Sequence, residues 1–274
     1  MSDYQHIRVE PISTALGAVI HGVDCKAELP DQVIDEIRSS WLEHLVVFFP
    51  EQYLEPAEQL TFARRFGVPV EYPMIQGMEG FPEVVEVIKL PHETHNFGGI
   101  WHSDTTYLES PPTGALLLAQ ELPPVGGDTL FANMYLAYET LSTGLKDMLD
   151  SLIVVQSSAK AGASKSREDR LSDSSAVAEQ VLESEHLAVR THPETGRKVL
   201  FVNYGHSIRF KNMTEAESKP LLDYLFAHQT RPEFTCRFQW TVGSMAMWDN
   251  RCTQHNPIND YHGFKRVMHR ISIN

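Results

Sequence analysis

The sequence is poor in cysteine and in basic residues, and each shortage excludes a class of protein. It has three cysteines, Cys25, Cys236 and Cys252, and this odd number at no metal-ligand spacing argues against a disulfide framework. Lys and Arg total 23 against 36 Asp and Glu, which gives a formal net charge of -13. Because phosphate backbones are bound by clustered cations, we expect no nucleic-acid partner. A small anionic substrate needs only one or two local cations and stays compatible with this charge.

Long apolar runs and nucleotide-binding loops are also missing. No stretch approaches the ~20 apolar residues that cross a bilayer, and the N-terminus lacks the charged and apolar regions of a secretory signal. With so few cysteines, this predicts a cytoplasmic protein without a membrane partner. Neither G-x-G-x-x-G nor G-x-x-x-x-G-K-[ST] occurs, so a nucleotide cofactor is not indicated.

What the sequence does contain is a series of short strand patterns separated by turn signals. Apolar or alternating runs cover 45–49, 114–121, 234–240 and 265–273, and the turn signal Pro-Pro-Val-Gly-Gly-Asp lies at 123–128. The 274 residues, 42% hydrophobic, can build a sizeable core. We therefore predict a mainly β chain with some α, a barrel-like double sheet with helical cover, in a single domain over 1–274.

Helical periodicity occurs in a few places between these strands. The expected helices are one opened by Asp31 as its cap, one over 56–66, one over 136–152, and one from Thr214 to about Ala227. Residues 156–185 are rich in Ser, Ala, Lys, Glu and Asp. We expect a surface loop or insertion there, with a mobile lid over an active site as the functional alternative.

The most informative segment is Trp101-His102-Ser103-Asp104. If it is extended, the side-chain period of two places His102 and Asp104 on one face, where both can hold a metal ion. His255 is the other histidine in a suggestive setting, and two histidines with one carboxylate suit a non-haem Fe(II) oxygenase. Alone, an H-x-D tripeptide also fits a solvated or core histidine. Arg266 and Arg270 follow on a terminal strand and, being four residues apart, share a face.

Together these segments resemble the taurine/2,4-dichlorophenoxyacetate dioxygenase family of Fe(II)- and 2-oxoglutarate-dependent oxygenases. The resemblance runs over nearly the whole chain and rests on several short anchors in order. They are Leu16-Gly17-Ala18, Gly22-Val23-Asp24, Val46-Val47-Phe48-Phe49, Arg65-Phe66-Gly67, Trp101-His102-Ser103-Asp104, Gly126-Gly127-Asp128-Thr129, Thr191-His192-Pro193, Trp248-Asp249-Asn250-Arg251 and Met268-His269-Arg270.

The resemblance implies a jelly-roll, or double-stranded β-helix, with the metal at one mouth. Carried over residue by residue, it implies His102, Asp104 and His255 as the catalytic iron ligands. It implies Thr129 and Arg266 as the residues that hold the distal carboxylate of 2-oxoglutarate. A guanidinium suits that role because its planar fork matches a carboxylate.

The substrate pocket departs from the members of the family that oxidise taurine. Arg270 matches the position that meets the anionic group of the substrate, and Tyr72, Gly98 and His206 occupy places of the polar and aromatic cluster that holds taurine. His206 stands where an aromatic ring is expected. These changes disfavour taurine, and a different sulfonate, an alkyl sulfate, an aryloxyalkanoate or another small carboxylate fits better.

The implied reaction is hydroxylation of such a small organic anion with Fe(II), 2-oxoglutarate and O2, giving succinate and CO2 as co-products. The carboxylate of Asp104 favours hydroxylation over halogenation, because its absence would leave room for a halide. Two alternatives stay open from the residues alone: a non-catalytic jelly-roll that senses 2-oxoglutarate, and a zinc hydrolase. The resemblance also implies a homo-oligomer, either a dimer or a tetramer.

Overall fold

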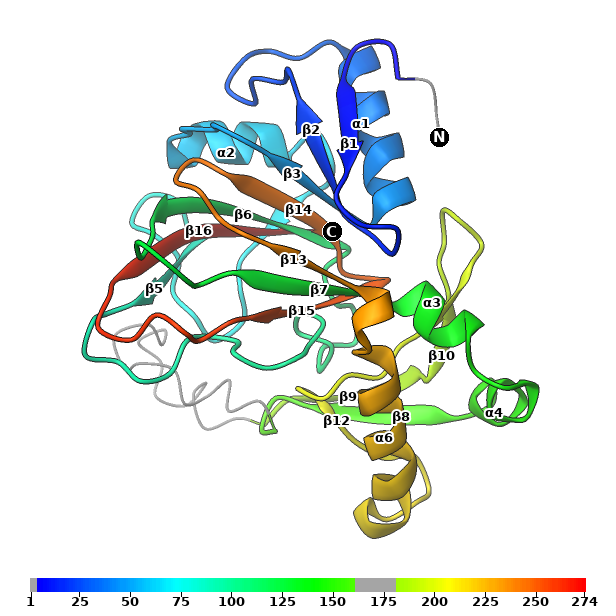
Figure 1. Cartoon of the computed structure of the whole chain (residues 1–274). Coiled ribbons are helices and arrows are strands. Elements are labelled where there is room, and N and C mark those ends of the chain that lie inside the picture. Colours follow the sequence, from blue (N-terminus) through cyan, green and yellow to red (C-terminus); the bar gives the residue numbers. More distant parts are fainter. Residues whose placement is uncertain (1–3, 161–180) are drawn as a thin grey trace.

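The framework of the protein is a pair of largely antiparallel sheets that face each other, seen in a computed structural model that describes residues 4–160 and 181–274 (Figure 1). The larger sheet has eight strands in the order β1-β2-β3-β14-β6-β16-β4, and β5 also pairs with β16. Its strands are Arg8–Pro11 (β1), Ala18–His21 (β2), Val46–Phe49 (β3), Pro69–Val70 (β4), Val84–Lys89 (β5), Gly114–Glu121 (β6), Met245–Asp249 (β14) and Arg266–Ile273 (β16).

The facing sheet is shorter and carries one wall of the cavity described below. Its three strands run in the order β13-β7-β15, with bounds Thr235–Phe238, Thr129–Asn133 and Thr253–Pro257. Two small sheets extend the molecule below it in Figure 1. They are β12-β8-β9, with bounds Ser207–Phe210, Ile153–Ser157 and Glu183–Leu187, and β10-β11, with bounds Val189–Thr191 and Lys198–Leu200. The predicted mainly β chain with helical cover is confirmed.

The helices begin and end where side chains can satisfy the backbone. They are Asp31–His44 (α1), Pro56–Ala63 (α2), Met134–Glu139 (α3), Thr143–Leu149 (α4) and Glu215–Gln229 (α6), with a short 3-10 helix at Pro232–Phe234 (η3). The capping box of Thr214 with Glu217 opens α6 as predicted. The strand expected from residue 234 to 240 is shorter, because η3 precedes it and β13 ends at Phe238.

Two helix predictions need correction. Asp31 does not cap α1 but is its first residue; Pro30 holds the cap position, and the Asp31 carboxylate instead accepts a hydrogen bond from Arg65 Nη2 at 2.5 Å. The single helix expected over 136–152 is two, α3 and α4, because Ser142 caps the second one by accepting from the backbone N–H of Leu145.

The prediction of a loop or insertion over 156–185 is wrong at both ends. Ile153–Ser157 (β8) and Glu183–Leu187 (β9) form an antiparallel pair in which Ser157 is opposite Glu183. Residues 161–180, on which the rest of that prediction and the lid alternative fall, lie outside the described residues. Within the described residues, no helix is both long and apolar enough to cross a membrane.

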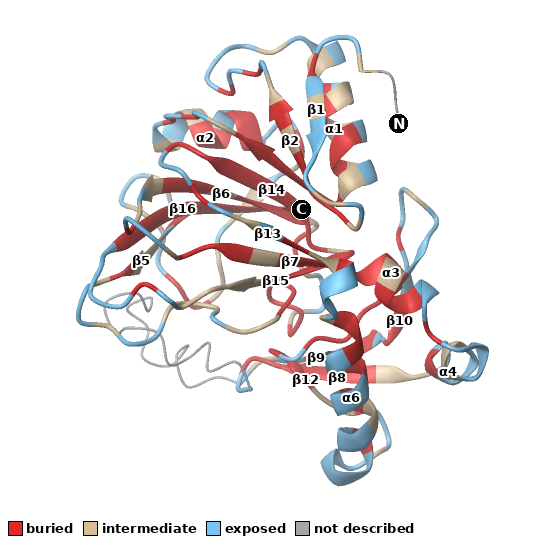
Figure 2. Cartoon of the chain, viewed as in Figure 1, coloured by how far each residue is buried: buried red, intermediate tan, exposed pale blue. Residues whose placement is uncertain are grey.

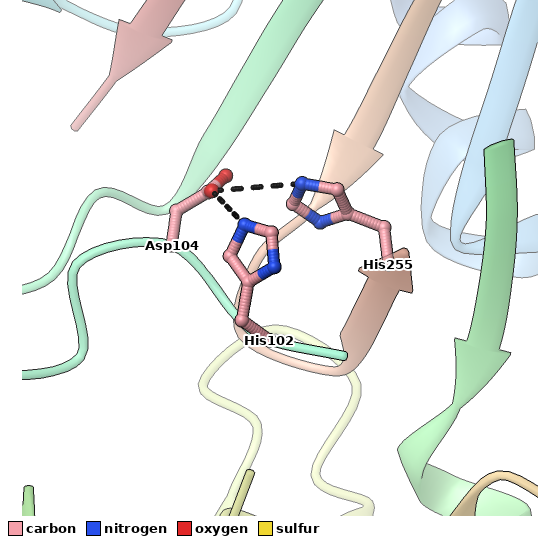
Figure 3. Close-up of side chains that lie close together, drawn as sticks. All are labelled: His102, Asp104 and His255. Carbon is pink, nitrogen blue, oxygen red and sulfur yellow. Dashed lines mark ion pairs between the residues drawn. The ribbon is translucent and has the colours of Figure 1, made fainter. Parts of the chain in front are cut away.

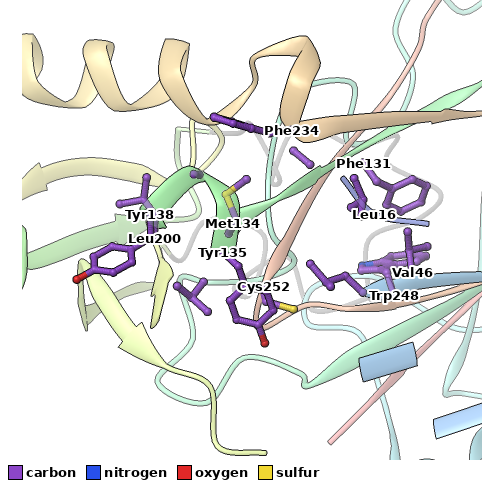
Figure 4. Packing of buried hydrophobic residues seen from close by; sticks show 14 of the residues in the cluster. Leu16, Val46, Phe131, Met134, Tyr135, Tyr138, Leu200, Phe234, Trp248 and Cys252 are labelled. Atoms are coloured by element: carbon purple, nitrogen blue, oxygen red, sulfur yellow. The ribbon is translucent and has the colours of Figure 1, made fainter. Parts of the chain in front are cut away.

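Buried side chains form two clusters, one on each face of the larger sheet (Figure 2). Between the two sheets, Phe48 of β3 stacks on Phe238 of β13 with ring centroids 3.8 Å apart, and Phe131 packs nearby (Figure 4). On the opposite face, α1 and α2 bury residues such as Ile37 and Phe62. The larger sheet is thus covered on both faces, which explains why all four residues of β3 and all eight of β16 are buried.

The alternation along β16 decides which of its side chains face the space between the sheets. Ile271 and Ile273 join the cluster under the helices, whereas Met268 belongs to the cluster between the sheets. Since successive side chains point to opposite faces, Arg266 and Arg270 point the same way as Met268. The prediction that the two arginines share a face is confirmed, and that face is the one toward the shorter sheet β13-β7-β15.

Candidate active site

The three predicted metal ligands converge at one mouth of the double sheet (Figure 3). His102 and His255 form an isolated antiparallel bridge in which each backbone N–H donates to the other residue's carbonyl oxygen, at 3.1 and 2.9 Å. Asp104 lies in the turn that follows, so the segment is extended only around His102. The Asp104 Oδ1 atom lies 3.6 Å from His102 Nε2 and 3.7 Å from His255 Nε2. All three side chains are buried.

Hydrogen bonds leave the right lone pairs available for a cation. His102 Nδ1 donates to the Ile100 carbonyl oxygen at 2.7 Å, which fixes a proton on Nδ1 and turns Nε2 toward Asp104 Oδ1. Asp104 Oδ2 accepts from Trp248 Nε1 at 3.2 Å and pairs with Arg270 Nη2 at 2.8 Å. Asp104 Oδ1 is buried without a hydrogen-bond partner among the described residues. These donor atoms fit a divalent cation bound by two imidazoles and one carboxylate.

The electrostatics favour the ligand forms of these groups. Burial alone would raise the pKa of Asp104, but the Arg270 guanidinium and the two imidazoles hold it well below its usual range. Burial, with the neighbouring His102, lowers the pKa of His255. Asp104 is therefore ionised and His255 neutral, which are the protonation states that a divalent cation requires.

Asn250 fixes the turn that carries Asp104 and is a residue that the sequence reasoning missed. Its Oδ1 accepts from the Asp104 backbone N–H at 2.7 Å, and its Nδ2 donates to the carbonyl oxygens of Asp104 and Pro112 at 3.1 and 2.9 Å. Ser103 adds a hydrogen bond from Oγ to the Thr253 carbonyl oxygen at 2.7 Å. The Trp248-Asp249-Asn250-Arg251 segment could have pointed to this role, because the Asn250 amide is the one side chain in it that can both donate and accept hydrogen bonds.

A cavity runs from the two histidines toward Arg266 and Arg270, with Thr129 in its wall. Arg266 is 5% exposed, and its Nε and Nη2 atoms have no hydrogen-bond partner among the described residues. Burial lowers the pKa of Arg266, and Tyr261 and Asp128 offset part of that effect. Since an unpaired buried cation is costly, this arginine indicates an anion-binding position in the cavity.

Thr129 lines the same cavity as Arg266, but its hydroxyl already takes part in one hydrogen bond. Its Oγ1 accepts a hydrogen bond from Trp240 Nε1 at 3.0 Å. A hydroxyl keeps its own proton when it accepts, so it can still donate one hydrogen bond into the cavity. Trp240 was not predicted, and its Nε1 orients the Thr129 hydroxyl.

The predicted substrate residues surround the metal ligands. Arg270 forms an ion pair with the metal-ligand candidate Asp104. Its Cζ lies 4.8 Å from the centroid of the Tyr72 ring, so that ring covers the guanidinium.

Gly98 and His206 lie close to His102. Gly98 has a φ of +68°, and a Cβ there would lie 3.0 Å from His102 Cε1, so a side chain at this position would strain the backbone and crowd the His102 ring. The His206 ring lies edge-on to the His102 ring, with centroids 6.2 Å apart, and 5.0 Å from the ring of Tyr107, which was not predicted. Burial and the neighbouring His102 lower the pKa of His206 to about 3, so its ring is neutral beside His102.

Two facing sheets that bring together two imidazoles and a carboxylate, with a buried arginine in the adjoining cavity, form the kind of site that non-haem iron oxygenases have. The family described as "Taurine catabolism dioxygenase TauD, TfdA family" matches residues 8–272, and the chain belongs to it. It is a 2-oxoglutarate-dependent dioxygenase with the predicted jelly-roll core, and its cofactors are Fe(II), 2-oxoglutarate and O2. These findings support neither the zinc hydrolase nor the non-catalytic sensor.

Three similar proteins illustrate the range of the family. The chain is 34% identical to an alkylsulfatase of Acinetobacter baylyi, over 98% of this chain and 85% of that protein. It is 32% identical to an alpha-ketoglutarate-dependent sulfate ester dioxygenase of Pseudomonas putida, over 97% and 88%. The crystal structure of a taurine dioxygenase from Burkholderia xenovorans superposes with a TM-score of 0.82 at 36% identity, over 98% and 89%.

Proposed function

We propose that His102, Asp104 and His255 hold the Fe(II) and that Arg266, with Thr129, holds the distal carboxylate of 2-oxoglutarate. The observation that carries this proposal is the convergence of three ligand atoms, all within 4.8 Å of one another, at the cavity that His102, His255 and Arg266 line. When bound, Fe(II) with the keto acid supplies the activation of O2, with succinate and CO2 as products. The chain's own residues bind and orient the reactants and exclude water.

We also propose that the substrate is the sulfate ester of an aliphatic alcohol. Two relatives are named for sulfate esters, an alkylsulfatase and a sulfate ester dioxygenase. Arg270 supplies a cation for the sulfate group next to the metal site. Val87, Phe97, Leu117 and Pro257 give the same cavity apolar walls for an alkyl chain. An alkyl chain needs no hydrogen-bond partner at Gly98, where there is no side chain.

The geometry explains how such a substrate would be consumed. Arg270 would hold the sulfate, which places the carbon that bears the ester oxygen near the metal ligands. Insertion of one oxygen atom into a C–H bond of that carbon gives a hydroxyl beside the ester oxygen. Loss of the hydroxyl proton then forms a C=O bond while the C–O bond to sulfate breaks, so an aldehyde and inorganic sulfate are released.

The metal and keto-acid assignments are tested without any primary substrate. Fe(II) and then 2-oxoglutarate are added without oxygen, the visible charge-transfer band of the chelate is recorded, and succinate is measured after oxygen is admitted. We expect the band and succinate in the wild type and neither in His102→Ala. Succinate formation that is unaffected by His102→Ala would contradict the proposed ligand set.

The substrate class is tested with a panel of alkyl sulfates, alkyl sulfonates, taurine and aryloxyalkanoates, scored by stimulated succinate release. Alkyl sulfates are expected to stimulate most and to release sulfate and aldehyde in equal amounts. In Arg270→Lys, which keeps a cation beside Asp104 but loses the planar guanidinium, 2-oxoglutarate binding should persist while stimulation by the substrate falls. Stronger stimulation by an aryloxyalkanoate would overturn the sulfate ester proposal and leave the ligand assignment intact. Loss of keto-acid binding alone would show that the two arginine roles are exchanged.

We further propose that the chain forms one domain, works in the cytoplasm and assembles as a homo-oligomer, dimer or tetramer. Its three cysteines are buried and unpaired, which suits a reducing compartment. Light scattering on the eluting peak of a size-exclusion column tests the assembly, and a monomer at micromolar concentration would contradict it.

A further inference from the structure

Lys89 and Arg266 form an unusual pair of buried cations on neighbouring strands. They are direct partners in the antiparallel pairing of β5 with β16, which lie side by side in Figure 1. Residues in that relation have side chains on the same face of the sheet, where like charges repel. Lys89 is 3% exposed and Arg266 5%. Within residues 4–160 and 181–274, neither makes an ion pair with an acid.

The contacts of Lys89 are with neutral groups. Its Nζ donates to Asn259 Oδ1 at 2.7 Å and lies 4.1 Å from the centroid of the Tyr261 ring. The Arg266 Cζ lies 6.0 Å from that same ring centroid, so one aromatic ring is shared by both cations. Neither contact neutralises a charge, although the negative face of the ring reduces the cost of burial.

The two acids that act on Lys89, Asp260 and Glu93, both make hydrogen bonds to backbone N–H groups. Asp260 Oδ1 accepts the backbone N–H of Gly127 at 2.8 Å, and its Oδ2 lies 3.8 Å from Arg237 Nη2. Glu93 Oε2 accepts the backbone N–H of Leu90 at 2.5 Å. Burial lowers the pKa of Lys89, and Glu93 and Asp260 offset only part of that effect. Neither cation is in direct contact with an acid among the described residues, and Asp128 offsets only part of the cost of burying Arg266, so an anion bound beside Arg266 would be favoured by both charges.

We propose that Lys89 is a second cation of the 2-oxoglutarate site, which favours keto acids with a distal carboxylate by long-range attraction rather than by contact. This inference rests on the proposed role of Arg266. Lys89 does not line the cavity, whereas Arg266 does, so the arginine makes the contact and the lysine adds charge behind Tyr261. Lys89 would act on the distal carboxylate from roughly 10 Å. At that separation and an effective dielectric of about 20, one extra charge changes the affinity for 2-oxoglutarate on the order of tenfold.

The test compares two ligands that differ in one group. 2-Oxoglutarate has the distal carboxylate, and 2-oxopentanoate has the same chain length without it. Binding of each is measured by calorimetry on the Mn(II)-loaded protein, so that no turnover is involved. In Lys89→Met we expect 2-oxoglutarate to bind on the order of tenfold more weakly and 2-oxopentanoate to bind as in the wild type. Lys89→Arg, which keeps the charge, should retain most of the preference.

Several outcomes would overturn the inference. If Lys89→Met weakens the binding of both keto acids equally, Lys89 only supports the fold around Asn259. If it weakens the binding of neither, Lys89 has no role in the 2-oxoglutarate site. Thermal unfolding without ligand is the control, because loss of a buried repulsive charge should leave Lys89→Met as stable as the wild type. If that variant unfolds, Lys89→Gln, which keeps a donor toward Asn259, takes its place.

Failure of this inference is distinguishable from failure of the proposed function. Arg266→Met is measured in the same titrations, and it should weaken 2-oxoglutarate on the order of thirtyfold or more, as expected when one partner of a buried charge pair is lost. If Arg266→Met has this effect and Lys89→Met has none, only the role of Lys89 is wrong. If Arg266→Met has no effect, the carboxylate site itself is misplaced.

Discussion

At the scale of single residues, Asp104 takes part in more of the site's polar contacts than either of the two histidines does. One carboxylate oxygen is left for a metal, and the other is held between Trp248 Nε1 and Arg270 Nη2. The same side chain therefore connects the metal position with the residue proposed to meet the substrate. The two partners differ in kind, since Trp248 orients the carboxylate and Arg270 stabilises its charge.

Trp248→Phe is expected to weaken metal binding without a large change in packing. The substitution keeps an aromatic ring in the core but removes the hydrogen bond to Asp104 Oδ2. Loss of such an orienting partner typically costs about 10- to 100-fold in metal affinity. Calorimetric titration with Mn(II) measures the effect. Trp240→Phe is the matched control, because its Nε1 donates to Thr129 and not to a ligand. Equal metal affinities in Trp248→Phe and the wild type would show that Arg270 alone fixes the carboxylate.

The sequence predicted the site residues that belong to recognisable motifs. His102, Asp104 and His255 were found because the weak H-x-D signal is accompanied by several family anchors in the same order along the chain, and the structure brings the three side chains together. Asn250 and Tyr107 were missed because their roles depend on the exact path of a turn and of a neighbouring loop. An amide or a phenol carries no spacing rule that reveals such contacts.

At the scale of elements, the prediction succeeded where patterns are long and failed at boundaries. The central strands β6 and β16 were predicted within a residue, because their apolar or alternating runs are uninterrupted. The helix expected over 136–152 broke at Ser142, where a side-chain hydrogen bond competes with the helix. The strand pair β8 and β9 was not predicted, because the polar residues of β9 and the last two residues of β8 fall in the segment that was interpreted as a loop or insertion.

Glu36 ties the N-terminal strand region to α1 and gives that contact a pH dependence. Its carboxylate accepts the backbone N–H groups of Gln5, His6 and Ile7 at 2.8, 2.9 and 3.1 Å. Burial opposes ionisation, but the His6 ring and these N–H groups lower the pKa of Glu36 to about 2 from 4.5. The ionised form thus stabilises the fold fully above about pH 4.5, and this contribution is lost as pH falls toward 2.

Glu36→Gln is expected to reduce the free energy of unfolding by about 1–3 kcal/mol at pH 7, the usual range for hydrogen bonds to a charged group. The difference from the wild type should shrink as pH is lowered from 5 toward 2, because the wild-type carboxyl becomes protonated. Urea unfolding at several pH values gives both numbers. A difference that stays constant over this pH range would show that the charge of Glu36 does not contribute.

At the scale of the whole molecule, the site is a meeting point of segments that are far apart in the chain. His102 and His255 are joined by reciprocal backbone hydrogen bonds, and Arg266 and Arg270 enter from β16, which pairs with both β5 and β6. Sequence spacing predicts which faces the side chains share, but it does not state which distant segments pair. The resemblance to a known family supplied that topology here.

Because the ligands come from distant segments, metal binding should stabilise the entire fold. Mn(II) at 100 times its dissociation constant contributes about 2.7 kcal/mol, which for a chain of this size corresponds to a rise in Tm of roughly 5–10 °C. Differential scanning calorimetry with and without Mn(II) measures it. His255→Ala should lose most of the rise, and His228→Ala, a histidine whose hydrogen bonds lie far from the ligands, should keep it. A full rise in His255→Ala would place the cation elsewhere.

The position of β16 has a consequence for biosynthesis. This strand follows every other strand in the chain, yet its partners on either side are β5 and β6. Until β16 has been synthesised, β5 and β6 lack the strand that pairs with both of them. The proposed metal site needs His255 and the proposed 2-oxoglutarate site needs Arg266, so neither site is complete until these late residues have been synthesised.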